Sequence, residues 1–121
     1  MASGPAKFVQ EGGSIDYTPP PQGADVLVGA VVVQGDLVGV TQAPIKWRGA
    51  GQLGSIAVIG VFDFNKAVGA GSAIPAGTLT YWDAAAQNAT KNSAAGANKL
   101  IGKAVRTTVD ADTIVRVRLQ Q

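Results

Sequence analysis

Apolar and polar residues alternate most clearly near the end of the chain. Within residues 113–119, Val115, Val117 and Leu119 fall on one face, and Arg116 and Arg118 fall on the other. Alternation with a period of two is typical of a strand that has one buried and one solvated face. We therefore expect a half-buried antiparallel strand over residues 113–119.

Further short segments rich in β-branched and aromatic residues are separated by turns that contain Gly or Pro. In chain order, these predicted strands are 30–33, 37–40, 55–59, 61–66, 78–83 and 99–105. The first two form a predicted hairpin through Gln34-Gly35-Asp36, and Ile74-Pro75-Ala76-Gly77 suits a type I turn. We expect a turn, or a single helical turn, at 84–87. About seven to nine short strands of this kind predict an all-β fold, a small antiparallel β-sandwich or barrel.

Residues 1–24 differ from the β body expected over 25–121 and form a predicted extended N-terminal arm. Its segments 7–10 and 14–18 are expected to pair as a hairpin through Gly12-Gly13, and the prolines that follow favour a stiff, extended connection. An isolated hairpin is only marginally stable in water, so this arm should pack on its own body or on a partner. Phe8 and Tyr17 are natural anchors for a partner surface.

Composition excludes several classes of function. The 121 residues suit one domain, with 46% apolar residues, 6% aromatic residues and a net charge of +2. The chain has no Cys and no His, which excludes disulfides, thiolate or imidazole metal sites, and catalysis that uses these side chains. We expect no cofactor, no metal and no enzymatic activity. No signal peptide or membrane-spanning run is apparent, which predicts synthesis in the cytoplasm and no membrane partner.

The motifs that resemble ligand sites fit poorly. Gly102-Lys103 resembles a phosphate-binding loop, but five residues rather than four separate Gly96 from Gly102, and Ala104 replaces the hydroxyl residue. Asp110 and Asp112 are better explained as turn residues than as metal ligands. The basic residues of 99–118 lack interleaved aromatics, so we expect no nucleic-acid partner.

Tyr81 and Trp82 offer aromatic surface in a predicted strand. A role in the core or at a subunit interface is the simpler interpretation, and stacking on a sugar or base is the alternative. The alternative function is therefore a surface carbohydrate-binding module for host attachment. A third hypothesis, an enzyme or nucleotide-binding accessory factor, would require Lys103.

An ordered set of segments resembles the bacteriophage capsid cement, or head decoration, proteins. The segments are KFVQEG (7–12), IDYT (15–18), LVGV (37–40), VIGVF (58–62), AG (76–77) before YWD (81–83), LIGKA (100–104) and VRVRL (115–119). They span nearly the whole chain. Some members of this family carry a label that likens them to RecA-type recombinases, and the mismatched phosphate loop argues against that label here.

The resemblance implies a structural virion protein that is made in the host cytoplasm and binds the outer surface of an icosahedral head. Such proteins stabilise the head by bridging major capsid protein subunits, commonly as homotrimers. For this chain, the resemblance implies capsid contacts by the arm, with Tyr81 and Trp82 as a possible subunit interface. The expected arm contacts are Phe8, Val9, Ile15 and Tyr17.

Overall fold

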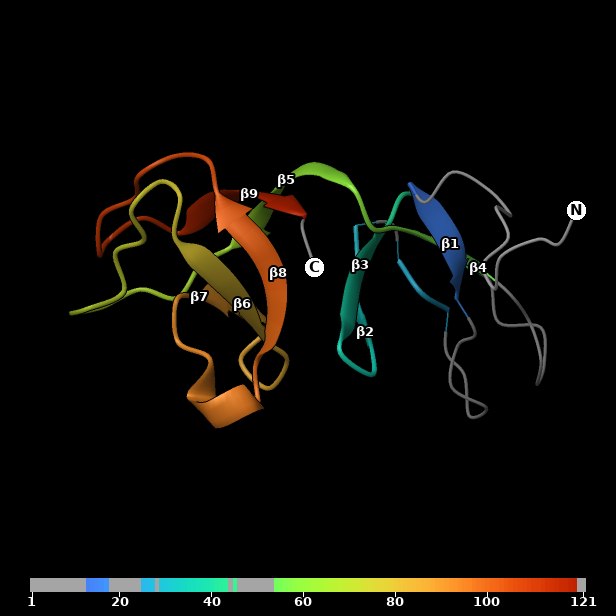
Figure 1. Ribbon diagram of the computed structural model, residues 1–121, viewed down its shortest axis with the longest axis horizontal. Coiled ribbons are helices and arrows are strands. Elements are labelled where there is room, and N and C mark those ends of the chain that lie inside the picture. The colour runs from blue at the N-terminus through green and yellow to red at the C-terminus, as the bar shows by residue number, and fades with distance from the viewer. Residues whose placement is uncertain (1–12, 18–24, 28, 44, 46–53, 120–121) are drawn as a thin grey trace, which may run out of the picture.

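The computed structural model describes residues 13–17, 25–27, 29–43, 45 and 54–119, and this part of the chain is almost entirely β (Figure 1). In chain order, its strands are β1 (Ser14–Tyr17), β2 (Val31–Gln34), β3 (Leu37–Thr41), β4 (Gly54–Ala57), β5 (Gly60–Asn65), β6 (Leu79–Asp83), β7 (Asn88–Thr90), β8 (Lys99–Ala104) and β9 (Ile114–Leu119). A short 3-10 turn, η1 (Ala94–Gly96), precedes β8. The predicted all-β fold is confirmed.

The first four strands form an antiparallel sheet in the order β1-β4-β3-β2. The predicted hairpin of β2 and β3 is confirmed, with Gln34 opposite Leu37 and a positive φ of 63° at Gly35 in the turn. β1 pairs with β4, and Ile15 lies opposite Ile56. The second arm segment is therefore a strand of this sheet, while its expected partner at 7–10 lies outside the described residues.

The other five strands form an antiparallel sheet in the order β5-β9-β8-β6-β7. The sheet curls until its two edges meet. There, Lys66 and Ala89 form an isolated parallel β-bridge, and the Ala67 N–H donates to the Ala89 carbonyl at 3.1 Å. The predicted alternation in β9 is confirmed, since Val115 and Val117 are buried. β7 was not predicted.

The turn before β6 lies one residue later than predicted. The Thr78 N–H donates to the Pro75 carbonyl at 3.1 Å, and Gly77 has a φ of 86°, which a type II turn requires at its third residue. The predicted type I turn over 74–77 is wrong because Ile74 belongs to the core. The Ile74 carbonyl accepts from the Thr108 N–H at 2.9 Å and is not the acceptor that closes the turn.

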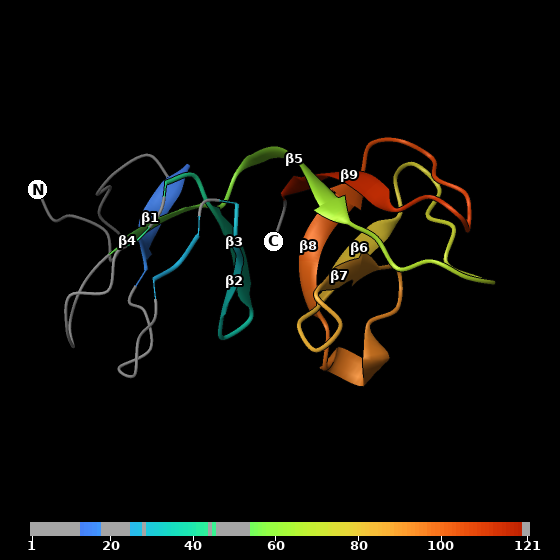
Figure 2. The ribbon, with the colours of Figure 1, turned by 180° about the vertical axis from the view of Figure 1, so that it is seen from behind.

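The two sheets sit side by side with β3 nearest to β8 (Figures 1 and 2). The hydrophobic core extends from β3 into the five-stranded sheet. β3 contributes Val38 and Val40, and the remaining core residues come from the five-stranded sheet and its loops. These are Phe64, Ile74, Trp82, Ala89, Ile101, Ala104, Val115, Val117 and Leu119. The arrangement is a β-sandwich in which the five-stranded sheet supplies most of the core.

Candidate functional site

The edge strand β1 carries two of the four predicted arm contacts. Ile15 and Tyr17 are half-buried and share one face of the strand, whereas Asp16 is exposed on the other face. Phe8 and Val9 lie outside the described residues. β1 is the outer strand of its sheet in the described part of the chain, and such an edge can accept a strand from another protein. The arm contacts stay a prediction.

Tyr81 and Trp82 point to opposite faces of β6. Trp82 is only 5% exposed and packs against Phe64, with ring centroids 6.1 Å apart. Tyr81 is half-buried on the outer face of the sheet. Because the Trp82 ring fills the core, the pair does not form the exposed stacking platform that the carbohydrate alternative requires. A subunit interface at this position stays a prediction, with Tyr81 as its accessible residue.

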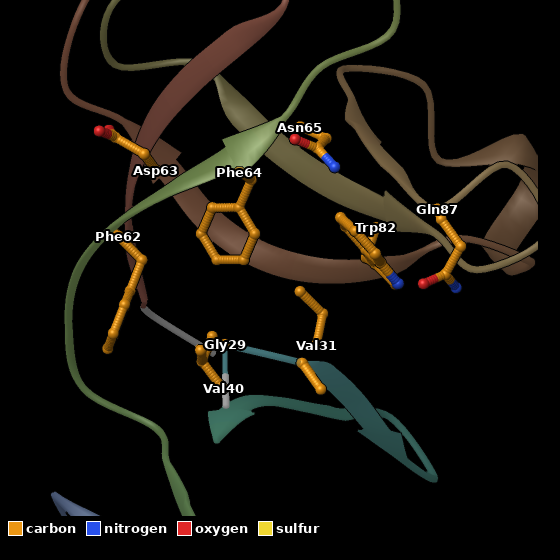
Figure 3. A pocket seen from close by; sticks show the side chains of 10 residues that line it. Gly29, Val31, Val40, Phe62, Asp63, Phe64, Asn65, Trp82 and Gln87 are labelled. Atoms are coloured by element: carbon orange, nitrogen blue, oxygen red, sulfur yellow. The ribbon is translucent and has the colours of Figure 1, made fainter. Parts of the chain in front are cut away.

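A pocket of about 280 Å³ separates the β2–β3 hairpin from β5 and β6 (Figure 3). Its apolar walls are Val31 and Val40 on one side and Phe62, Phe64 and Trp82 on the other. The side chains of Phe62 and Phe64 lie on the same face of β5, as their alternation predicts, and their rings meet edge to face at 6.5 Å. The sequence gives no sign of the pocket itself, because it depends on how the two sheets meet.

Within the described ranges, two ion pairs join charged side chains of neighbouring elements. Arg116 holds Asp63 across β5 and β9 through two hydrogen bonds, Nε to Oδ1 at 2.8 Å and a second at 3.2 Å. This hydrogen bonding lowers the pKa of Asp63 and raises the pKa of Arg116. Lys99 contacts Asp36 at 2.8 Å, linking the β2–β3 turn to β8, and its hydrogen bond lowers the pKa of Asp36.

A family model described as phage cement protein matches residues 9–119. The match includes both sheets and the edge strand β1. The chain belongs to the phage cement protein family. This membership confirms the resemblance inferred from the ordered segments. It indicates a structural role in stabilising a phage capsid and a location in the virion capsid. Searches of curated proteins and of solved structures found no match.

The motifs that resembled ligand sites are explained by the strands and turns in which they lie in this cement protein. Lys103 lies within strand β8 and not in a loop that enters a helix, so the context of a phosphate-binding loop is missing. Asp110 accepts a hydrogen bond from the Ala73 N–H, and Asp112 accepts one from the Val109 N–H, both at 2.8 Å. The described residues contain no cluster of three metal-ligating side chains. They also contain no helix long and apolar enough to cross a membrane.

Proposed function

We propose that this cement protein binds the outer surface of an icosahedral phage head and bridges major capsid protein subunits as a homotrimer. The family match over residues 9–119 carries the proposal. Pressure from packaged DNA pushes capsid subunits apart, and a protein that contacts several of them resists this separation. Individually weak contacts combine because each one raises the effective concentration of the next.

The edge strand β1 is the proposed capsid contact, together with Phe8 and Val9 of the arm. An added strand would gain main-chain hydrogen bonds, while side chains on alternate positions provide selectivity. Ile15 and Tyr17 supply an apolar face for this purpose, since both are half-buried on the same side of β1.

The proposed trimer interface includes Tyr81, which faces outward from the five-stranded sheet. Trp82 supports this contact indirectly, because its ring packs in the core beneath the same strand. Tyrosine is enriched in the buried centres of protein interfaces, where its ring supplies contact area at a low cost in side-chain entropy.

The test is to mix the purified chain with undecorated expanded heads of its own phage. We expect saturable binding to the outside of the head, visible by electron microscopy, and a higher melting temperature of the decorated heads. Replacing Ile15 and Tyr17 together by Ser should weaken binding by about 30-fold or more, if each acts as an interface anchor. Asp16→Ala is the matched control on the opposite face of β1. Failure of the unmodified chain to bind its heads would contradict the proposal.

A further inference from the structure

A row of four exposed side chains crosses the outer face of the five-stranded sheet. Val61 lies opposite Arg118, Arg118 lies opposite Lys103, and Lys103 lies opposite Leu79. The four residues come from β5, β9, β8 and β6, so the row spans four adjacent strands. Val61 is 53% exposed and Leu79 is 44% exposed. The row therefore places two cations side by side between two solvated aliphatic side chains.

The two cations are not neutralised within the described part of the chain. Neither Arg118 nor Lys103 forms an ion pair or side-chain hydrogen bond there, although their backbones are directly paired. Like charges placed directly opposite each other on a sheet destabilise the pairing. The pair therefore carries a cost in the isolated chain.

In the neighbouring row, the arginine of the same strand, β9, is paired with a carboxylate. Two residues before Arg118, Arg116 lies opposite Asp63, which takes both hydrogen bonds of its guanidinium. In the row of four exposed side chains, Val61 occupies the position on β5 that Asp63 occupies in the neighbouring row. The face thus has one arginine that is neutralised by a neighbouring carboxylate and one exposed cationic pair that has no acidic partner among the described residues.

We propose that the row Val61–Arg118–Lys103–Leu79 is a docking surface for an acidic, partly apolar patch on the capsid protein. The inference rests on the proposed function and names a second capsid-binding surface, apart from β1. Carboxylates of the partner would pair with the guanidinium and the ammonium, and the aliphatic side chains would be covered at the flanks. A symmetric contact with the same row of another copy is disfavoured because it would bring cations against cations.

The experiment compares the affinity of three full-length proteins for undecorated heads over a range of salt concentrations. They are the unmodified chain, the double variant Lys103→Gln/Arg118→Gln, and the control Asp63→Asn/Arg116→Gln. The control removes an ion pair from the same face without changing the net charge. We expect the first variant to bind about ten-fold or more weakly with a flatter salt dependence, and the control to bind within about three-fold of the unmodified chain. The melting temperature of Lys103→Gln/Arg118→Gln should be unchanged or higher than that of the unmodified chain, which would show that this variant folds.

Each other outcome overturns the inference in a recognisable way. Equal binding of the unmodified chain and Lys103→Gln/Arg118→Gln removes this surface but leaves the proposed function intact. Absence of binding by the unmodified chain removes both. Loss of affinity for duplex DNA, with head binding retained, would identify a nucleic-acid surface. A lower solution mass, again with head binding retained, would place the row between copies of the chain.

Discussion

Lys66 is a buried lysine whose contacts allow a quantitative prediction. Only 4% of its surface is exposed, at the point where β5 ends against β7. Its Nζ donates to the carbonyls of Ala67 at 2.8 Å and Asp112 at 3.2 Å, and it lies 3.4 Å from the Ser72 hydroxyl. These acceptors belong to the loop after β5 and the loop before β9. The ammonium therefore ties two loops together at the closure of the five-stranded sheet.

The change Lys66→Met removes the three donors but keeps a side chain of similar length. Leaving buried acceptors without a donor costs about 1–3 kcal/mol for each group. The variant no longer buries an ammonium, whose desolvation costs several kcal/mol and so opposes this loss. With two short carbonyl contacts broken, we expect the free energy of unfolding to fall by about 2 kcal/mol, which for a chain of this size lowers the melting temperature by about 8 °C.

The assay is thermal and urea unfolding of both proteins, followed by circular dichroism. Lys91→Met is the matched control because Lys91 is exposed outside the strands, and its replacement should change stability by less than about 0.5 kcal/mol. A Lys66→Met protein that is as stable as the unmodified chain, or more stable, would refute the reasoning. It would show that the desolvation cost of this ammonium exceeds the gain from its contacts.

Three further predictions concern the core and the charged surface. Gly39→Ala should cost about 1–3 kcal/mol in urea unfolding, because the new Cβ would lie 2.6 Å from Ile56 Cδ1. Trp82→Ala should lower the free energy of unfolding by about 3–5 kcal/mol, whereas Tyr81→Ala should leave the monomer folded and lower the solution mass. Equal destabilisation by the two changes would contradict the assignment of Trp82 to the core and Tyr81 to the subunit interface. The unmodified chain should be more stable than Asp63→Asn above pH 3.8, and this difference should be lost as the pH falls through the lowered pKa of Asp63. A difference in melting temperature between the two proteins that does not depend on pH would contradict this prediction.

The strands with a clear alternation were predictable from the sequence. β9 and β5 each have one buried and one solvated face, and this environment imposes a period of two on the residue types. β7 could not be predicted in the same way, since it has three residues and only Ala89 is buried. Its strand conformation depends on pairing with β6, which lies beside it in the sheet.

The features that depend on register between distant strands were missed. The Gly12-Gly13 signal predicts only a local hairpin, whose segment 7–10 lies outside the described residues. The sequence does not indicate that β1 also pairs with β4, about 40 residues away, where Ile56 offers an apolar partner for Ile15. Lys66 looks like an ordinary lysine at the end of a strand, yet Asp112, 46 residues further along, supplies one of its acceptors. The adjacency of Arg118 and Lys103 likewise exists only once β8 and β9 are paired.

The two sheets differ in how they are stabilised, and this difference fits a capsid-bound protein. The five-stranded sheet closes on itself and supplies most of the common core, so burial of apolar side chains is its main source of stability. The segment that precedes β2 in the four-stranded sheet is held by polar contacts. Leu27 in this segment is 74% exposed, and its carbonyl accepts a hydrogen bond from the Thr41 hydroxyl at 2.7 Å. A partner that binds only the folded form adds its binding free energy to the stability of that form. A capsid strand paired with β1 would therefore stabilise the sheet with the smaller core, while the five-stranded sheet would present a rigid face to the second proposed capsid contact.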